Sequence, residues 1–312
     1  MKILITGAAG NLGSFLARYL LAQSTHSLRL MAFRREPPRD IVVEGRSEVV
    51  HADLRAAQTL QAAVTGVDVI VHFAGVLFKA NPGRFLPTTN TTYFRNLVDA
   101  ACANGVRKII LISFPHVEGP TTFDAPATGR LDGTPISHHA RTRLEQERYL
   151  FAKVQEPISL RVGMVYGRGI LMIEAARWLA MHGLLGIWRE PTPIHLISTL
   201  DFCAACTGAI SHQSATGIYH LGDEGRVTLQ EFLTIACQHW GYRSPRVMPL
   251  GLIYAAAWMC EFYSHITGST SPLTRDFIDI ERVSYFGDTQ RMREELLANL
   301  KFPTIKEGLI TL

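Results

Sequence analysis

The sequence predicts an α/β protein, a doubly wound parallel sheet joined to a smaller, mainly helical C-terminal domain. Three observations lead to this fold class. Short apolar runs alternate with amphipathic helical stretches over the first two thirds of the chain, a pattern that indicates a parallel sheet with helices on both faces. A glycine-rich turn follows the first apolar run. After Gly167 the alternation weakens, and longer apolar helical stretches replace it.

The expected strands are short apolar runs, and the expected helices fill the gaps between them. A buried parallel strand should be a nearly continuous apolar run. The strands are Ile3–Thr6, Ser27–Phe33, Val49–Ala52, Val67–Phe73, Lys108–Ser113 and Ile158–Val162. The helices are Leu12–Gln23, Arg55–Val64, Thr89–Asn104 and His138–Val154. Between the last two, Gly119–Pro135 is rich in Gly, Pro, Thr and Asp and predicts a long functional loop.

The C-terminal third predicts three apolar helices, Ile170–Trp188, Thr228–Trp240 and Leu250–Ile266. We therefore expect residues 1–169 to form the sheet domain, with 192–220 returning to it. Residues 170–191 and 221–312 should form the second domain.

Composition narrows the class of protein. With 47% hydrophobic and 19% charged residues, the chain of 312 residues is not intrinsically disordered. A net charge of +4 without runs of like charge gives no support for a nucleic-acid partner. Five scattered cysteines fit a reducing compartment. The longest apolar run falls short of the ~20 residues that span a bilayer, and the N-terminus lacks the pattern of a secretory signal. We expect a cytoplasmic protein with no integral membrane segment and no metal.

The turn after the first strand carries glycines at positions 7, 10 and 13. This spacing permits a tight turn, close approach of the backbone to a pyrophosphate, and close packing of strand and helix. The following helix N-terminus offers free N–H groups to the phosphates. The pattern predicts a dinucleotide site formed by Gly7, Gly10, Asn11, Leu12 and Gly13; the alternative is a purely structural turn.

Further motifs, in order along nearly the whole chain, resemble the extended short-chain dehydrogenase/reductase family, which includes nucleotide-sugar epimerases and 3β-hydroxysteroid dehydrogenases. They are Asp53-Leu54, His72-Phe73-Ala74-Gly75, Asn90 with Asn96, Leu160-Arg161, Val165-Tyr166-Gly167, Asp288-Thr289 and Phe302-Pro303…Glu307-Gly308-Leu309. The resemblance implies that Asp53 and Leu54 lie at the adenine ring. It also implies that Phe73, Ala74, Gly75 and Asn90 line the cofactor. A homodimer formed through the helices Thr89–Asn104 and His138–Val154 would also be typical of the family.

The end of the second expected strand bears on the choice of cofactor. NAD-preferring proteins carry an acidic residue there for the ribose 2′-hydroxyl, whereas this chain has Ala32 or Phe33, followed by Arg34 and Arg35. Guanidinium groups can hold a 2′-phosphate. We predict NADP as cofactor, with NAD as the alternative; a solvated basic turn would also explain the arginines.

The family's catalytic Ser/Thr, Tyr and Lys correspond here to Phe114, His139 and Arg143. Phe114 cannot donate a hydrogen bond to a substrate oxygen. His139 can carry a proton, and Arg143 can hold ribose hydroxyls but does not readily release a proton. We predict His139 as proton carrier, Arg143 as ribose clamp and the neighbouring Ser113 as an oxygen contact. Alternatively, His139 is an exposed helix residue beside His138.

Phe114, Tyr93 and Met164 are expected at the substrate pocket, Met164 where the resemblance implies an Asn. Tyr93 either packs within its helix or supplies the missing phenol. These departures argue against a nucleotide-sugar substrate. The aromatic residues of Leu250–Ile266 resemble the C-terminal helices of the 3β-hydroxysteroid dehydrogenase branch. Three roles are open for these aromatic residues: they line an apolar pocket, they belong to the core, or they form a peripheral membrane contact.

The sequence therefore predicts an NADP(H)-binding enzyme that acts on a small, rather apolar molecule by redox chemistry, epimerisation or proton transfer. Two alternatives stay open. One is a catalytically inactive NADP-binding sensor or scaffold protein. The other is a non-redox isomerase or cyclase on the same fold.

Overall fold

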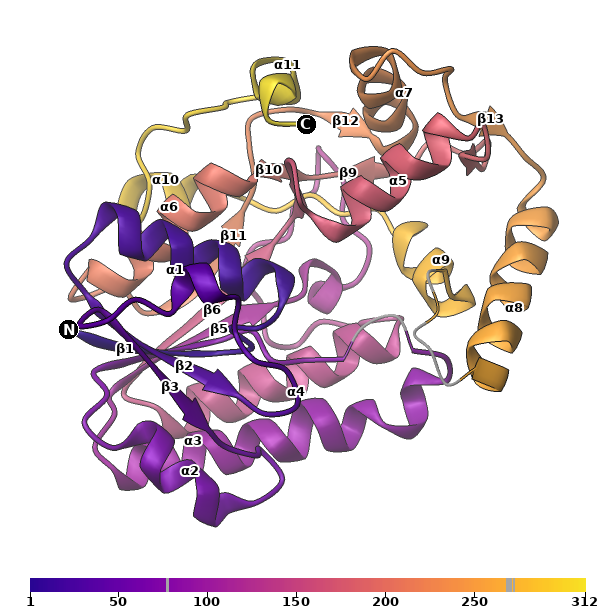
Figure 1. Cartoon of the computed structure of the whole chain (residues 1–312). Coiled ribbons are helices and arrows are strands. Elements are labelled where there is room, and N and C mark those ends of the chain that lie inside the picture. Colours follow the sequence, from indigo (N-terminus) through magenta and orange to yellow (C-terminus); the bar gives the residue numbers. More distant parts are fainter. Residues whose placement is uncertain (77–78, 268–270, 272) are drawn as a thin grey trace.

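The computed structural model describes residues 1–76, 79–267, 271 and 273–312. A seven-stranded sheet forms its centre, in the order β11-β6-β5-β4-β1-β2-β3 (Figure 1), and all the strand pairs are parallel. The strands are β1 (Lys2–Thr6), β2 (Ser27–Ala32), β3 (Ser47–His51), β4 (Val69–His72), β5 (Lys108–Ser113), β6 (Glu156–Val162) and β11 (Gly217–Leu221). The strand order reverses between β1 and β4, and ligands of such sheets bind in the crevice at that point. The predicted fold class is confirmed.

Helices cover both faces of the sheet because neighbouring strand residues point to opposite faces. Ile3 and Ile5 of β1 pack in the core beneath α1, whereas Leu4 between them belongs to the core on the other face. Figure 1 shows α1 and α6 on one side and α2, α3 and α4 on the other. The helices are α1 (Asn11–Gln23), α6 (Thr199–Ser211), α2 (Ala57–Val64), α3 (Tyr93–Ala103) and α4 (His138–Lys153).

The C-terminal region combines helices with short strand pairs. The pairs are β7 (Met164–Tyr166) with β10 (Leu196–Ser198), β9 (Pro193–Ile194) with β12 (Val227–Thr228), and β8 (Gly186–Ile187) with β13 (Arg246–Val247). The helices are α5 (Leu171–Met181), α7 (Leu229–His239), α8 (Leu250–Thr267), α9 (Arg275–Glu281), α10 (Gln290–Glu295) and α11 (Ile305–Gly308). No helix in the described ranges is long and apolar enough to cross a membrane.

The helix expected over Ile170–Trp188 is shorter than predicted. Gly183 adopts φ +67°, and the N–H of Leu184 donates to the carbonyl of Leu179 at 2.8 Å. A glycine in the left-handed region with this hydrogen bond is a common way for a helix to end. The chain then continues into β8, which has too few residues to show a periodic pattern.

The C-terminal segment is fixed against the second half of the sheet. The carboxylate of Asp201 accepts the N–H groups of Lys301 and Phe302 at 2.6 and 3.1 Å. A Cβ added at Gly308 would lie 2.0 Å from the hydroxyl oxygen of Tyr166. Two of the motifs that suggested the family therefore meet in space, and Gly308 is required by that contact.

Candidate active site

The glycine turn leaves the backbone bare at the N-terminus of α1. Gly7 has φ +73°, and a Cβ there would lie 3.0 Å from the N atom of Ala74. A Cβ at Gly13 would lie 2.4 Å from the carbonyl oxygen of Gly7. No side chain caps α1, whose N-cap is Gly10. Its first N–H groups therefore lack a side-chain partner, and the turn fits a pyrophosphate.

Asn11 has a structural task that the sequence did not indicate. Its Nδ2 donates to the carbonyl of Gly169 at 2.8 Å, and its Oδ1 accepts the N–H of Leu171 at 3.0 Å. The side chain therefore ties the turn to the start of α5. Any contact of Asn11 with phosphate must come from its backbone, and the next residue, Leu12, packs against the main core.

Gly75, Asn90 and Arg143 lie together at the far end of the crevice. A Cβ at Gly75 would lie 2.7 Å from Nη2 of Arg143 and 3.9 Å from Oδ1 of Asn90. Asn90 donates to Thr142 at 3.1 Å, whereas its buried Oδ1 has no hydrogen-bond partner among the described residues. Asn90 lies in a π-helical turn before α3, a feature frequent at functional sites. The free acceptor Oδ1 of Asn90, the guanidinium of Arg143 and the glycine without a side chain leave an arrangement that fits the hydroxyl groups of a ribose.

His72 precedes Phe73 and Ala74 at the floor of this crevice. Its Nδ1 lies 2.8 Å from Oγ1 of Thr6, and its ring contacts Phe94. Burial, and then the charge of Arg143, lower the pKa of His72 to about 3. The imidazole is therefore neutral and has a structural role.

The adenosine end is rich in arginine. Phe33 is 49% exposed, and the guanidinium carbons of Arg34 and Arg55 lie 5.3 and 5.1 Å from its ring centre. Asp53 forms an ion pair of 2.7 Å with Arg55. Arg35 is exposed. Arg55 was not predicted, although it stands only two residues after Asp53.

Two further residues define this end. The carbonyl of Leu54 accepts a hydrogen bond from Asn96 at 2.8 Å. The hydrogen bond to Asp53 raises the pKa of Arg55, and Tyr93 adds a smaller contribution. Tyr93, the first residue of α3, is partly buried, and its place at the substrate pocket stays a prediction.

His139 lies in the first turn of α4, which Ser137 caps by accepting the N–H of Ala140 at 3.1 Å. It is 7% exposed and so is not a surface helix residue. Its Nε2 lies 3.4 Å from Oδ2 of Asp276 on α9. Burial, followed by the charges of Arg143 and His138, lowers the pKa of His139 to about 4. The imidazole is neutral at neutral pH and has a carboxylate beside it.

Asp276 was not predicted as a site residue, because α9 is a short helix that contains none of the recognised motifs. Burial raises its pKa, and the nearby Asp279 and Glu261 add to the effect while His138 opposes it. The spacing of residues in the sequence could not reveal this contact. His139 and Asp276 are 137 residues apart, and only the fold of the second domain brings them together.

Ser113 does not have the free hydroxyl that an oxygen contact requires. Its Oγ donates to Glu147 at 2.6 Å, and the residue is buried. The ring of Phe114 takes the position toward α4 instead, 6.3 Å from the ring of His139, and packs against the small core cluster of Val117, Ala140 and Leu144. The expectation for Ser113 is therefore corrected, because its proton is committed to Glu147.

A buried charge network lies behind these residues. Arg161 is fully buried and pairs with Glu118 and, at 2.6 Å, with Glu147. Glu118 also accepts the N–H groups of Thr128 and Gly129. Burial opposes ionisation of Glu118, but hydrogen bonds from His220 and Gly129 and the charge of Arg161 prevail and lower its pKa to about 2. The network holds the long loop against the carboxyl end of the sheet.

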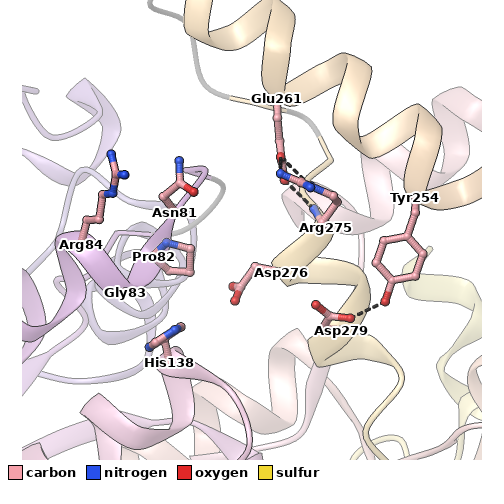
Figure 2. Close-up of a pocket in the computed structure, with 10 residues that line it drawn as sticks. All are labelled: Asn81, Pro82, Gly83, Arg84, His138, Tyr254, Glu261, Arg275, Asp276 and Asp279. Carbon is pink, nitrogen blue, oxygen red and sulfur yellow. Dashed lines mark hydrogen bonds and ion pairs between the residues drawn. The ribbon is translucent and has the colours of Figure 1, made fainter.

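A cavity of 540 Å³ adjoins His139 (Figure 2). Asp276 points into it from α9, opposite the Asn81–Arg84 segment and beside His138. Its lining is Asn81, Pro82, Gly83, Arg84, His138, Tyr254, Glu261, Arg275, Asp276 and Asp279. Most of these residues have polar or charged side chains.

The aromatic residues that suggested an apolar pocket lie elsewhere. Trp258 and Phe262 are 52% and 54% exposed and do not line the cavity. Met164 packs against the main core in β7, and it too is absent from the lining. The expectation of a rather apolar substrate stays a prediction, which these aromatic residues do not support.

Within the described residues, no group of His, Cys, Asp and Glu is arranged to hold a metal ion. Cys203 and Cys206 are buried in α6, where burial raises the pKa of both thiols. Both act as packing residues.

The fold and the crevice together define a dinucleotide-binding protein of the doubly wound class. The family model described as NAD(P)H-binding matches residues 7–164. The chain belongs to this NAD(P)H-binding family.

Relatives with assigned activities include a uronate dehydrogenase of Pseudomonas syringae pv. tomato, 34% identical over 59% of this chain and 66% of that protein. The human 3 beta-hydroxysteroid dehydrogenase type 7 is 30% identical over 42% of this chain and 37% of that protein. The chain thus spans less than two thirds of either relative. The dTDP-glucose 4,6-dehydratase DesIV of Streptomyces venezuelae, solved with NAD, shares the fold with a TM-score of 0.78 and 20% identity, over 100% of this chain and 95% of that one.

Proposed function

We propose that the protein is an NADP(H)-dependent enzyme that oxidises or reduces, or epimerises through such a step, a small polar molecule carrying a hydroxyl or carbonyl group. One observation carries the proposal. The buried His139 lies 3.4 Å from Asp276, which lines a 540 Å³ cavity, and Arg143, one turn further along α4, lies over Gly75 in the cofactor crevice.

The dinucleotide supplies a hydride acceptor or donor when it is bound; the chain's own residues handle the proton. In the oxidation direction, the neutral imidazole of His139 takes the hydroxyl proton of the substrate. Asp276 stabilises the imidazolium that forms and positions the ring. In reduction, His139 returns the proton to the carbonyl oxygen. General acid–base catalysis of this kind contributes ~10²–10⁴-fold in rate.

Arg143 and Asn90 provide the ribose contacts in this proposal. The guanidinium of Arg143 is held by Gln146 at 2.8 Å, and burial lowers its pKa to about 10. It therefore stays charged at neutral pH and donates to the ribose hydroxyls. The orphaned Oδ1 of Asn90 accepts from the same group of hydroxyls.

The cavity walls favour a polar substrate. Arg84, within the described part of the chain, forms no ion pair, and it lines the cavity on the wall opposite Asp276 (Figure 2). Such a cation suits a carboxylate, and the surrounding Asp and His side chains suit hydroxyl groups. The relative named uronate dehydrogenase supports a hydroxylated, acidic substrate.

The preference for NADP(H) rests on the arginines at the adenosine end. Arg34 and Arg55 flank Phe33, Arg35 follows, and no carboxylate stands at the end of β2 to accept a ribose 2′-hydroxyl. A 2′-phosphate can form bidentate, charge-assisted hydrogen bonds with these groups.

We further propose a homodimer through α3 and α4. These helices pack against each other on one face of the sheet, and their outer surface is polar, with Arg95, Asp99 and Arg148 exposed. Resemblance to the family supports this interface.

The test is turnover of a panel of hydroxy acids and uronic acids with NADP⁺, followed by NADPH absorbance. We expect His139→Ala to lower kcat by ~10²–10⁴-fold with NADPH binding retained. His182→Ala, an exposed histidine on α5, is the control. Unchanged turnover in His139→Ala would remove the mechanism.

A companion pair of variants separates Asp276 from the rest of the cavity. Asp276→Asn should lower kcat by roughly 10²-fold with little change in KM, because the carboxylate acts on the imidazole. Asp279→Asn, which alters a cavity carboxylate that accepts from Tyr254, should alter KM instead. Equal effects of both on KM alone would contradict the positioning role.

A second candidate function is a catalytically inactive NADP-binding sensor or scaffold. It is favoured by Phe114 and by the committed hydroxyl of Ser113, which leave no oxygen-polarising group at the family's position. It predicts saturable NADPH binding without turnover of any compound in the panel.

A further inference from the structure

The outer face of α8 is apolar although it is open to solvent. Large apolar side chains, each more than half exposed, recur along it: Leu252, Trp258, Met259, Phe262, Tyr263 and Ile266. At 100° per residue they all fall on one arc of the helix, and Trp258 stacks on Phe262 at 5.6 Å. The opposite side packs inward through Ile253, Ala257 and Glu261. A helix that is apolar on both sides is expected to be covered.

The surface continues beyond α8. Val247 of β13 and Leu184 beside β8 are also highly exposed; these two strands pair, and β8 contacts α8. Figure 1 shows α8 at the outer edge of the C-terminal region, with no other element beyond it. We call the exposed apolar residues of α8, together with Val247 and Leu184, the α8 surface.

The exposed charges in the stretch of sequence that contains α8 have one sign. Between Phe232 and Thr274 the sequence contains a single acidic residue, Glu261, which is buried and paired with Arg275 at 2.9 Å. Arg243 and Arg246 are exposed just before α8. In the described ranges neither forms an ion pair.

We infer that the α8 surface docks the protein peripherally on an anionic lipid bilayer. Helix α8 would lie in the plane of the headgroups, with Trp258, Phe262 and Ile266 inserted among them, as helices with aromatic and aliphatic faces do. Arg243 and Arg246 would meet the lipid phosphates, and basic residues close to such a surface add to binding.

Charge complementarity favours lipid over a second copy of this chain. A second α8 surface would bring two more arginines and no exposed acidic residue to neutralise them. Anionic headgroups provide both the counter-charge and the apolar phase. The inner side of the same helix supplies Tyr254 and Glu261 to the cavity, so the surface is separate from the proposed catalytic site.

Co-sedimentation of the full chain with vesicles tests the inference. We expect binding to phosphatidylcholine vesicles that contain phosphatidylglycerol, weakened by salt, and at least tenfold weaker binding to phosphatidylcholine alone. Trp258→Ser with Phe262→Ser should lower the apparent affinity by about 100-fold, since each buried aromatic side chain is worth roughly tenfold or more. Arg243→Ser with Arg246→Ser should lower binding to the anionic vesicles by about 10-fold or more.

The matched control is Ile310→Ser, an equally exposed apolar residue near the C-terminus, which should bind as the unaltered chain does. Retained NADPH binding shows that each variant folds; if the first double variant does not fold, Tyr263→Ser with Ile266→Ser replaces it. Absence of vesicle binding would overturn the inference. So would equal binding to both kinds of vesicle, or a dimer in solution that the same double variant abolishes.

Discussion

At the scale of the residue, the proposed chemistry depends on the imidazole of His139. Burial and Arg143 lower its pKa from an ordinary 6.5 to about 4. Because the pKa of His139 is lowered in the folded state, the neutral imidazole persists as pH falls and is lost only near pH 4. For oxidation, kcat/KM should therefore stay high to about pH 5 and fall below that. A pH–rate profile checks this, and an acidic limb near 6.5 would contradict it.

Asp223 is one residue that should make stability depend on pH. Burial raises its pKa from 3.8 to about 7, and its Oδ2 has no hydrogen-bond partner in the part of the chain that the structure describes. Because the folded value exceeds the unfolded one, this contribution to stability is complete below about pH 4 and is lost as pH rises through about 7. Asp223→Asn should be more stable than the unaltered chain at pH 8, by about 2–4 kcal/mol.

Urea unfolding at pH 5 and at pH 8 measures this effect. Asp201→Asn is the matched control, since that buried carboxylate accepts the hydroxyl of Ser198 and the N–H groups of Lys301 and Phe302 and its loss should destabilise the protein at both pH values. A destabilised Asp223→Asn at pH 8 would show that its charge is compensated.

At the scale of the element, Arg161 joins β6 to α4 and to the loop that follows β5. Its pairs with Glu118 and Glu147 are buried, so Arg161→Leu leaves two carboxylates without their cation. We expect a loss of about 3–5 kcal/mol in the free energy of unfolding. Arg189→Leu, an exposed change after β8, should shift it by less than about 0.5 kcal/mol. Similar unfolding curves for both variants would count against the network.

The elements that the sequence predicted correctly share one property: the pattern that indicates them lies within a short stretch of the chain. The main strands are buried on both faces and therefore appear as apolar runs, and Gly7, Gly10 and Gly13 are close together in the chain. Two-residue strands such as β8 carry no period, and the end of α5 depended on the conformation of Gly183. Asp276 reaches His139 only through the packing of α9, which no spacing encodes.

At the scale of the whole molecule, the dinucleotide crevice and the polar cavity meet at α4. Its first turn carries His139 toward α9, and Arg143 in its second turn reaches Gly75. The sequence placed both residues correctly on one helix because the motif spacing is local. The sequence could not show that the aromatic residues of α8 are exposed, because the docking of that helix decides which of its sides faces inward.

The central claim is that the crevice binds NADP(H), and a fluorescence titration of the purified chain with NADPH and NADH tests it most directly. We predict saturable binding of NADPH at least about tenfold tighter than NADH, since each charge-assisted contact to a phosphate is worth ~1.5–3 kcal/mol. Arg34→Ser with Arg35→Ser should remove the difference, and Arg39→Ser, an exposed arginine of the same loop, should not. Binding of neither nucleotide would mean that the glycine turn is structural and would contradict the account.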